Sequence, residues 1–271
     1  MHHGPVTGAP RDDDLLGLAV RAAHAAGALL VERFGGPATG LTAKSSRTDL
    51  VSDTDRDAEA LILGMISSAR PGDAILAEEG GTAAGAGDGP VRWLVDPLDG
   101  TINYLWGIPQ WSVSVAALDA EGPLAGVVHD PCRGETFSAR RGAGARLDDR
   151  PLRLGAGADL DQALVGTGFN YRAQERARQA ARLRTVLPAV RDVRRFGSAA
   201  IDLAWVAAGR LDGYFETGLN AWDWAAGRLL VTEAGGVVQE LPPAGGSPGG
   251  VVAAPTRLIG PLRALVDAAG A

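Results

Sequence analysis

The segment WLVDPLDGTINY, residues 93–104, constrains the fold of this chain more than any other stretch. Its first residues, 93–95, are apolar and predict a short buried strand that ends on a carboxylate, Asp96. Pro97 fixes φ and has no amide hydrogen to donate, so we expect the strand to stop there. The segment therefore predicts a buried strand whose end carries an acidic side chain.

The residues after Pro97 combine a second carboxylate with an uncovered backbone. Asp99 is followed by Gly100, which allows close approach to the backbone, and by Thr101, whose hydroxyl can begin a short helix. Such a group can bind a divalent metal ion together with a phosphate. Asp-Pro-x-Asp-Gly is also a good β-turn, so this segment alone leaves a plain turn and a functional site equally open.

Composition limits the classes of protein to which the chain can belong. Its 271 residues, 46% of them hydrophobic, suffice for a substantial core in a single α/β enzyme. The net charge of −6 argues against a nucleic acid or an anionic membrane as partner, so an anionic substrate would need metal ions or a locally positive pocket. The single cysteine, Cys132, excludes an internal disulfide and a cysteine-based metal cage, which fits a cytoplasmic location. We expect no membrane span, because no apolar run approaches the required length, and a disordered tail over residues 1–11.

The rest of the chain predicts helices and strands with no internal repeat or interdomain linker. We expect one domain over residues 12–271, with a first half at 12–155 and a second at 156–271. Amphipathic spacing and capping residues predict helices over 12–34, 56–69, 172–187, 199–208, 223–234 and 256–269. Apolar runs predict strands at 74–79, 111–118, 123–130, 135–140, 163–169, 213–216, 237–238 and 251–254, with a hairpin over 142–152 and a flexible loop over 80–90.

Further acidic residues stand at the ends of these elements. Asp55 precedes the helix at 56, Glu78 and Glu79 end the strand at 74, and Asp223 begins a helix. Each has an ordinary explanation as a helix cap, a charge at the positive end of a helix, or a solvated surface charge. Because ligands of open α/β sheets gather at the carboxyl ends of strands, these acids could instead meet Asp96.

Convergence of these acids would require a cation. Two carboxylates ~4 Å apart repel by about 4 kcal/mol at an effective dielectric near 20. Ligands that are all oxygen favour magnesium over zinc. Two such ions ~3.5–4 Å apart can activate a water and stabilise a departing oxygen, which is a route to phosphate ester hydrolysis.

Other sites are disfavoured by missing residues. A calcium-binding loop starting near Asp53 would need glycine at Ala58, and the glycine pair Gly166-x-Gly168 lacks the third glycine of a dinucleotide site. Cys132 lacks the arginine six residues later that a phosphotyrosine-type nucleophile needs, because Ser138 stands there. No P-loop, Ser-His-Asp arrangement or histidine ligand set competes with the metal-dependent interpretation.

Taken together, the motifs resemble those of the inositol monophosphatase family of magnesium-dependent, lithium-sensitive phosphatases. The resemblance extends over roughly residues 12–260. The matching motifs occur in the family's order: Asp49-Leu-Val-Ser-Asp-Thr-Asp55, Glu78-Glu79, Asp96-Pro-Leu-Asp-Gly-Thr101 with Asn103, Trp222-Asp223-x-Ala-Ala, and Glu233-Ala-Gly-Gly236. The resemblance implies a layered αβαβα sandwich and a homodimer.

The resemblance also implies roles for individual residues. Glu78, Asp96 and the carbonyl of Leu98 would hold a first magnesium ion that activates the attacking water. Asp96, Asp99 and Asp223 would hold a second near the leaving oxygen, and Glu78 would contact a third, water-rich ion. Thr101, paired with Asp55, would orient and deprotonate the water, and Gly100 and Thr101 would offer N–H groups to the phosphate. The substrate's hydroxyls would contact Glu216, Asp99, Asp223 and the turn Gly197-Ser198-Ala199, while Lys44 and Glu79 are possible site residues.

The identity of the substrate rests on the segment 101–117 and, in the second half of the chain, on the run Gly166-Thr-Gly-Phe169. These residues look most like bacterial inositol-1-phosphatases, so we expect a small sugar or polyol phosphate, with myo-inositol-1-phosphate favoured. Asn220 replaces a histidine frequent in animal relatives, so we expect contacts near the leaving group to differ. Histidinol phosphate, fructose-1,6-bisphosphate and 3'-phosphoadenosine 5'-phosphate stay open as alternatives because their enzymes share the metal ligands. A non-catalytic scaffold with the same fold is the competing class.

Overall fold

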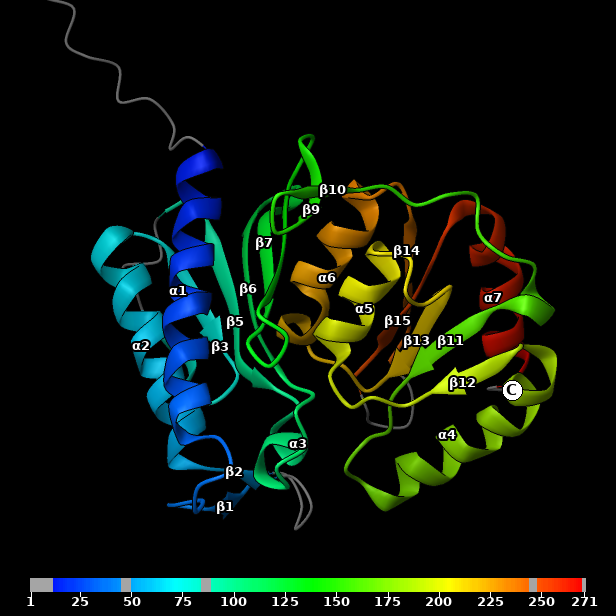
Figure 1. Ribbon diagram of the computed structural model, residues 1–271, viewed down its shortest axis with the longest axis horizontal. Coiled ribbons are helices and arrows are strands. Elements are labelled where there is room, and N and C mark those ends of the chain that lie inside the picture. Colours follow the sequence, from blue (N-terminus) through cyan, green and yellow to red (C-terminus); the bar gives the residue numbers. More distant parts are fainter. Residues whose placement is uncertain (1–11, 45–49, 84–88, 244–247, 270–271) are drawn as a thin grey trace, which may run out of the picture.

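The computed structural model describes residues 12–44, 50–83, 89–243 and 248–269. The predicted tail 1–11 and Asp49 of the first motif lie outside the described residues. Five layers follow one another across the molecule, as Figure 1 shows. Helices α1 and α2 cover one face of an eight-stranded sheet, α5 and α6 fill the space between this sheet and a five-stranded one, and α4 and α7 cover the outer side. The expected αβαβα sandwich is confirmed.

The helices lie close to where the sequence pattern predicts them. Described in chain order, the α-helices are α1 (Asp12–Arg33), α2 (Asp53–Ala69), α3 (Thr101–Leu105), α4 (Ala173–Val186), α5 (Ala199–Ala207), α6 (Ala221–Glu233) and α7 (Thr256–Ala268). Two short 3₁₀ turns are η1 (Leu160–Gln162) and η2 (Leu187–Ala189). Helix α2 begins three residues earlier than expected because Ser52, one of the two predicted caps, forms a capping box with Asp55.

The first sheet and a small ribbon come from the first half of the chain. The ribbon pairs β1 (Thr42–Ala43) with β2 (Leu50–Val51). The sheet has the strand order β10-β9-β8-β7-β6-β5-β3-β4. Its strands are β3 (Ala74–Ala77), β4 (Gly81–Ala83), β5 (Arg92–Asp99), β6 (Ser112–Asp119), β7 (Gly122–Asp130), β8 (Glu135–Arg140), β9 (Gly144–Leu147) and β10 (Arg150–Leu152).

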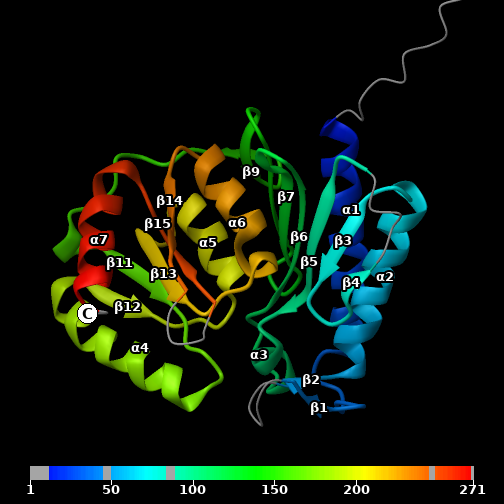
Figure 2. The same cartoon turned by 180° about the vertical axis from the view of Figure 1, so that it is seen from behind.

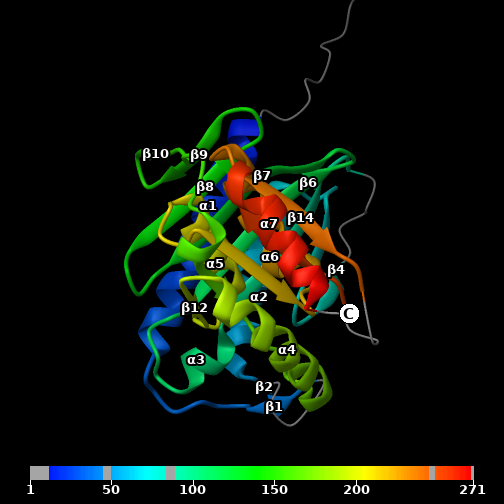
Figure 3. The same cartoon turned by 90° about the vertical axis from the view of Figure 1, so that its right-hand side faces the viewer.

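The second sheet has the order β12-β11-β13-β15-β14. Its strands are β11 (Leu164–Thr167), β12 (Asp192–Arg194), β13 (Gly213–Thr217), β14 (Val237–Leu241) and β15 (Gly250–Ala254). Figure 2 shows both sheets from behind, and Figure 3 shows α7 lying over the outer side of the second sheet with α4 below it. Strands β11 and β13 run parallel, which places the ends of both next to the first sheet's acidic strands.

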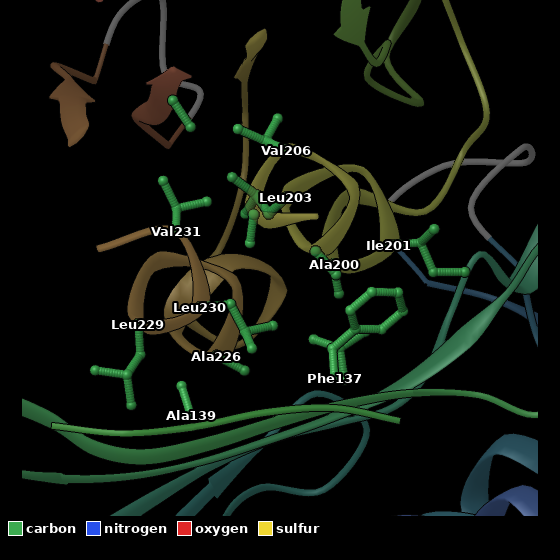
Figure 4. Packing of buried hydrophobic residues seen from close by; sticks show 14 of the residues in the cluster. Phe137, Ala139, Ala200, Ile201, Leu203, Val206, Ala226, Leu229, Leu230 and Val231 are labelled. Carbon is green, nitrogen blue, oxygen red and sulfur yellow. The ribbon is translucent and has the colours of Figure 1, made fainter. Parts of the chain in front are cut away.

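The middle layer joins the two sheets through a continuous apolar core. Small residues on α5 and α6, such as Ala200 and Ala226, let these helices lie close to each other and to the first sheet. Phe137 and Ala139 of β8 pack against them from that sheet (Figure 4). A Cβ at Gly126 of β7 would stand only 3.0 Å from the Cα of Ala226, so glycine is needed for this close contact. The packing fixes the N-terminal ends of α5 and α6 over the end of β5.

The prediction that the central strand stops at Asp96 was wrong, because β5 continues through Pro97 to Asp99. Its pairing with β6 shifts register between Asp96, which faces Ser114, and Asp99, which faces Ser112. An irregularity of this kind leaves Pro97 at a place where no ladder donor is required. The bulge turns consecutive side chains of this segment out of the regular alternation, which helps both acids reach one region.

The extent of one predicted loop and the reason given for expecting no membrane span need correction. Residues 81–83 of the predicted loop 80–90 form β4, which pairs antiparallel with β3 and covers the edge of the sheet, while 84–88 lie outside the described residues. The chain also contains one described helix, within α1 at Leu15–Arg33, that is long and apolar enough to cross a membrane. This helix packs its apolar face into the core, where Leu15, Leu18 and Leu30 are at most 4% exposed. Its length and composition therefore reflect a core helix that packs on the first sheet.

Candidate active site

A cavity of about 390 Å³ lies where the end of β5, the start of α3 and the N-terminal ends of α5 and α6 meet. The end of β13 and the segment 168–172 close its other side. Most of the predicted site residues line it: Lys44, Glu78, Asp96, Leu98, Asp99, Gly100, Thr101, Gly197, Ala199, Glu216 and Asp223. Asp55, Glu79 and Ser198 are not lining residues and instead contact residues that are.

The carboxylates of the cavity wall come from β5, β13, α6 and the residue after β3, which the fold brings together. Strands β3 and β5 are parallel neighbours, so Glu78, just after β3, lies beside the end of β5 that carries Asp96. Burial raises the pKa of Asp96 well above its usual range, and the charges of Glu78, Asp99 and Asp223 raise it further. Burial and the charges of Glu78 and Asp99 raise the pKa of Asp223 in the same way. The ionised forms of Asp96 and Asp223 are therefore destabilised by burial and by the neighbouring carboxylates.

Thr101 and Asp55 are paired as expected. The Thr101 hydroxyl lies 3.2 Å from Asp55 Oδ1 and 3.1 Å from the carbonyl oxygen of Leu98, and it can donate its hydrogen to either. Asp55 is fully buried. Its Oδ2 accepts from the Ser52 amide at 3.0 Å and from the Ser52 hydroxyl at 2.5 Å, as part of the capping box of α2. Asp55 is thus both a helix cap and the carboxylate behind the threonine.

Asp99 connects the first sheet to the N-terminal end of α5. Its Oδ2 accepts from the Ser198 hydroxyl at 2.6 Å and from the Ala200 amide at 2.7 Å. Ser198 is almost fully buried and its hydroxyl also accepts from the Ile201 amide, so it acts as the helix cap and as a support for Asp99. Burial raises the pKa of Asp99 to about 6, although the hydrogen bond from Ser198 lowers it.

The turn before α5 packs directly against Gly100. Gly100 has φ +98° and Gly197 has φ +93°, a backbone conformation that favours glycine. A Cβ on Gly100 would stand 3.2 Å from the carbonyl oxygen of Gly197. Asn103 holds this contact together, because its Nδ2 donates to the carbonyl of Gln110 at 2.7 Å and to that of Phe196 at 2.8 Å. The backbone around Thr101 is therefore positioned by residues almost a hundred positions away.

Asp223 and Glu216 line the cavity from the second half of the chain. Asp223 lies in the first turn of α6 and accepts from the Asn220 amide at 2.7 Å in a capping box. Glu216, near the end of β13, accepts from the Tyr214 hydroxyl at 2.5 Å. Burial raises the pKa of Glu216 to about 7, against the effect of the Tyr214 hydrogen bond and of the Arg195 charge. Glu216 thus carries a carboxyl group that titrates near neutrality beside the cavity.

Lys44 lies between the two glutamates that follow β3. Its ammonium group is 2.9 Å from Glu78 Oε1 and also donates to Glu79. Burial lowers the pKa of Lys44, but the attraction of Glu78 and Glu79 outweighs burial and raises it overall. Burial and the charge of Glu78 raise the pKa of Glu79 to about 7. Lys44 therefore supplies a positive charge next to Glu78. Together with Asp96, Asp99 and Asp223, Glu78 forms what we call the acidic wall of the cavity.

The donor atoms fit a hard divalent cation without already forming a complete cage. Among the residues that the structure describes, no three acidic, histidine or cysteine side chains are grouped as a metal site. The side chain of Glu78 pairs with Lys44, and that of Asp99 accepts from Ser198 at the start of α5. These contacts explain why the carboxylates are not grouped around one point. The carboxylates nevertheless line one cavity, raise the pKa of Asp96, and offer only oxygen donors, which is the chemistry that magnesium requires.

Several lining residues escaped sequence reasoning. The segment Gly168, Phe169, Asn170, Tyr171 and Arg172 lines the cavity, as do Arg195 and Trp222. For the segment 168–172 the sequence held one signal, the run Gly166-Thr-Gly-Phe169, which resembles bacterial inositol-1-phosphatases but assigns no role to a single residue. Arg195 is one of many arginines in residues 172–195, and only the fold shows that it faces the cavity.

Comparison with known proteins assigns the chain to a family. The model of the inositol monophosphatase family matches residues 12–267. Nus factor SuhB from Xylella fastidiosa is 46% identical over 222 residues, which cover 81% of this chain and 79% of the relative. Inositol-1-monophosphatase SuhB from Mycobacterium tuberculosis is 46% identical over 232 residues, covering 83% and 80%. The crystal structure of extragenic suppressor protein suhB from Bartonella henselae superposes with a TM-score of 0.85 at 37% identity, covering 93% of this chain and 98% of that one.

The chain belongs to the inositol monophosphatase family. The resemblance seen in its motifs is therefore confirmed. Family membership supports a phosphatase that acts on small phosphorylated substrates and that depends on a metal ion.

Proposed function

We propose that this protein hydrolyses a phosphate monoester with the help of magnesium, and that its substrate is myo-inositol-1-phosphate. The observation that carries this proposal is the contact between the Thr101 hydroxyl and the buried Asp55, in a cavity walled by carboxylates. A hydroxyl backed by a carboxylate can accept and pass on a proton from water, whereas a lone threonine is a poor base.

Two to three magnesium ions would be held by the acidic wall. Glu78, Asp96 and the carbonyl of Leu98 would hold the first, Asp96, Asp99 and Asp223 the second, and Glu78 a third through water. When bound, magnesium neutralises the carboxylates and the phosphate and lowers the pKa of a coordinated water. The mutual repulsion of these buried acids supports the assignment, because the ionised set needs a cation to be stable.

The remaining chemistry belongs to residues of the chain itself. Thr101 would orient the attacking water and pass its proton to Asp55 Oδ1, which the Ser52 amide and hydroxyl hold in place. The amides of Gly100 and Thr101, at the start of α3, would donate to phosphate oxygens. The hydrogen bonds from Asn103 keep this backbone next to Gly197, so the donors are in position before the substrate arrives.

The alcohol part of the substrate would be recognised by Glu216 and by residues close to it. The carboxylate of Glu216 can accept hydrogen bonds from adjacent hydroxyls, as can Asp99 and Asp223, and the small turn at Gly197 and Ala199 leaves room for a ring. This arrangement suits a polyol. Histidinol phosphate, fructose-1,6-bisphosphate and 3'-phosphoadenosine 5'-phosphate are the alternatives, because the same carboxylates would serve the reaction with each.

The test is phosphate release from these four esters, each with magnesium and with chelator. A strong magnesium-dependent preference for inositol-1-phosphate would support both the chemistry and the substrate. Preference for another ester would keep the chemistry and refute the substrate assignment. If none of the four releases phosphate, hydrolysis is refuted.

A second candidate function is an interaction role without catalysis. The name of the Xylella fastidiosa relative, Nus factor SuhB, favours it. The set of carboxylates around the cavity argues against it. Their mutual repulsion destabilises the fold unless a cation neutralises them, and a scaffold would not need to keep them. Turnover that requires magnesium would separate the two candidates, because a scaffold needs no metal-dependent hydrolysis.

A homodimer in the cytoplasm completes the proposal. The loop after α3 exposes Trp106 and Ile108, which are 65% and 48% exposed, and this apolar surface is of the kind that a dimer buries. The single cysteine fits a reducing compartment. Light scattering coupled to size exclusion would measure the mass, and a monomer at micromolar concentration would contradict the dimer.

A further inference from the structure

The glycine pair Gly166-x-Gly168 has no part in the proposed reaction, yet it lies beside the cavity. Strand β11 ends at Thr167 and pairs in parallel with β13, with Gly166 opposite Tyr214 and Thr167 opposite Phe215. Side chains alternate between the faces of a sheet. Gly166 and Gly168 therefore lie on the same side as Tyr214 and Glu216.

The carboxylate of Glu216 rests directly on Gly168. A Cβ at Gly168 would stand 1.9 Å from Glu216 Oε2 and 2.3 Å from Oε1, much closer than any side-chain atom can be. Gly168 is not among the glycines with positive φ, so its backbone conformation is open to alanine. Glycine is needed at position 168 because it leaves room for the Glu216 carboxylate.

Tyr214 holds the same carboxylate from the side. Its ring is fully buried, and its hydroxyl donates to Glu216 Oε2 at 2.5 Å. Gly166 makes room for the ring, because a Cβ there would stand 3.2 Å from Tyr214 Cδ2 and 2.9 Å from Leu211 Cδ1. The two glycines thus accommodate the tyrosine and the glutamate, one each.

The positive charge of Arg195 would attract the Glu216 carboxylate if this carboxylate lost its present contacts. Arg195 lines the cavity, and its positive charge acts on Glu216. A glutamate side chain has three rotatable bonds, so holding it in one place takes specific contacts. Without its support, Glu216 would turn toward Arg195 and would no longer present its oxygens to the substrate.

We propose that Gly168 and Tyr214 are positioning residues that hold the Glu216 carboxylate against the cavity wall and thereby set the preference for polyol phosphates. The inference rests on the proposed function, since Glu216 is taken to accept the substrate's hydroxyls. It concerns the alcohol part of the ester alone. Thr101, its partner Asp55 and the amides of Gly100 and Thr101, which act on the water and the phosphate in the proposed reaction, do not contact Gly168 or Tyr214 through any of their hydrogen bonds in the described residues.

The test compares two esters in the variant Gly168→Ala. For inositol-1-phosphate, the KM rises roughly ten- to hundredfold, as expected for the loss of a hydrogen bond to a charged group, while kcat changes far less. For 4-nitrophenyl phosphate, which has no polyol hydroxyls, kcat/KM stays within about twofold of the parent value. Tyr214→Phe shifts the same ratio by a smaller factor, roughly three- to tenfold.

Gly155→Ala is the matched control. Gly155 also lacks a positive φ, is exposed, and has open space where a Cβ would be, so both esters should react as before. An unchanged ratio of the two esters in Gly168→Ala would overturn the proposal. An equal loss with both esters would also overturn it, because Gly168 would then serve only the fold.

A crystal structure of Gly168→Ala tests the support independently of activity. Glu216 should leave the Tyr214 hydroxyl, and a carboxylate that stays within hydrogen-bonding distance of it would refute the proposal. If the parent protein releases phosphate from neither ester, the proposed function fails. The crystal structure still decides whether Gly168 holds the carboxylate.

Discussion

Replacing Asn103 by alanine removes a connection between the two halves of the molecule at the active site. The Asn103 amide donates at 2.7 Å to the carbonyl of Gln110 and at 2.8 Å to that of Phe196, which lies 93 positions along the chain. Asn103 and Gln110 are each only 6% exposed, whereas Phe196 is half-buried. The substitution therefore leaves one carbonyl without a partner in the interior and one that water can partly reach.

The size of the effect follows from these contacts. A buried polar group that loses its partner costs about 1–3 kcal/mol, and the accessible carbonyl costs less, so the free energy of unfolding should fall by about 2–4 kcal/mol. For a domain of this size that corresponds to a decrease in Tm of about 5–15 °C. Because the turn at Gly197 is no longer held against Gly100, kcat should fall by roughly tenfold or more.

Thermal unfolding followed by circular dichroism, together with magnesium-dependent phosphate release, would measure both effects. Gln174→Ala is the control, since it removes an exposed amide from α4 and should change stability by less than about 0.5 kcal/mol. A Tm for Asn103→Ala equal to that of the control would refute the energetic reasoning. A lower Tm with undiminished turnover would refute the argument that Asn103 positions the site.

Three further predictions follow from the acidic wall and from one half-buried histidine. Asp96→Asn and Asp223→Asn should each lower turnover by roughly a hundredfold or more with the circular dichroism spectrum unchanged, and near-normal turnover of Asp96→Asn at ordinary magnesium would contradict the two-metal assignment. Chelation should abolish phosphate release and lithium at millimolar concentration should inhibit it, so an enzyme insensitive to lithium would argue against an intact second metal site. Burial, with the neighbouring His24 charge, lowers the pKa of His129 to about 4, so the unfolded chain binds the extra proton between pH 6.5 and pH 4. Stability should therefore fall by up to about 3 kcal/mol as the pH drops through that window, and denaturant titrations of His129→Gln should show a shallower decline.

Much of the fold could be read from local patterns. Amphipathic spacing located the helices to within a few residues, as for α1, because helix boundaries depend on nearby capping and turn residues. Alternation and turns likewise predicted the meander β6–β7–β8. Local rules misplaced the end of β5, since a proline is excluded from a strand only where the ladder needs its amide, and the bulge beside Asp96 removes that need.

The candidate site likewise contains residues that short motifs identify and residues that only the fold brings together. The carboxylates of β5 and the helix-capping acids Asp55 and Asp223 stand in short motifs, so the sequence identified them and the family. The supports of these acids are distant in the chain: Ser198 donates to Asp99 across 99 positions, and Thr101 contacts Asp55 across 46. No local pattern encodes such pairs.

The sequence by itself thus determined the chemical groups of this protein, namely oxygen donors at strand ends and helix starts, and with them the family. Only the tertiary structure decided which of these groups share a cavity and why Gly168 must leave room for Glu216. It also decided that Lys44 pairs with Glu78 and that Asn103 holds the backbone beside Thr101. The physical reason is that side-chain chemistry and backbone preference are properties of short segments. Distance, burial and charge coupling exist only after the two sheets have packed on α5 and α6.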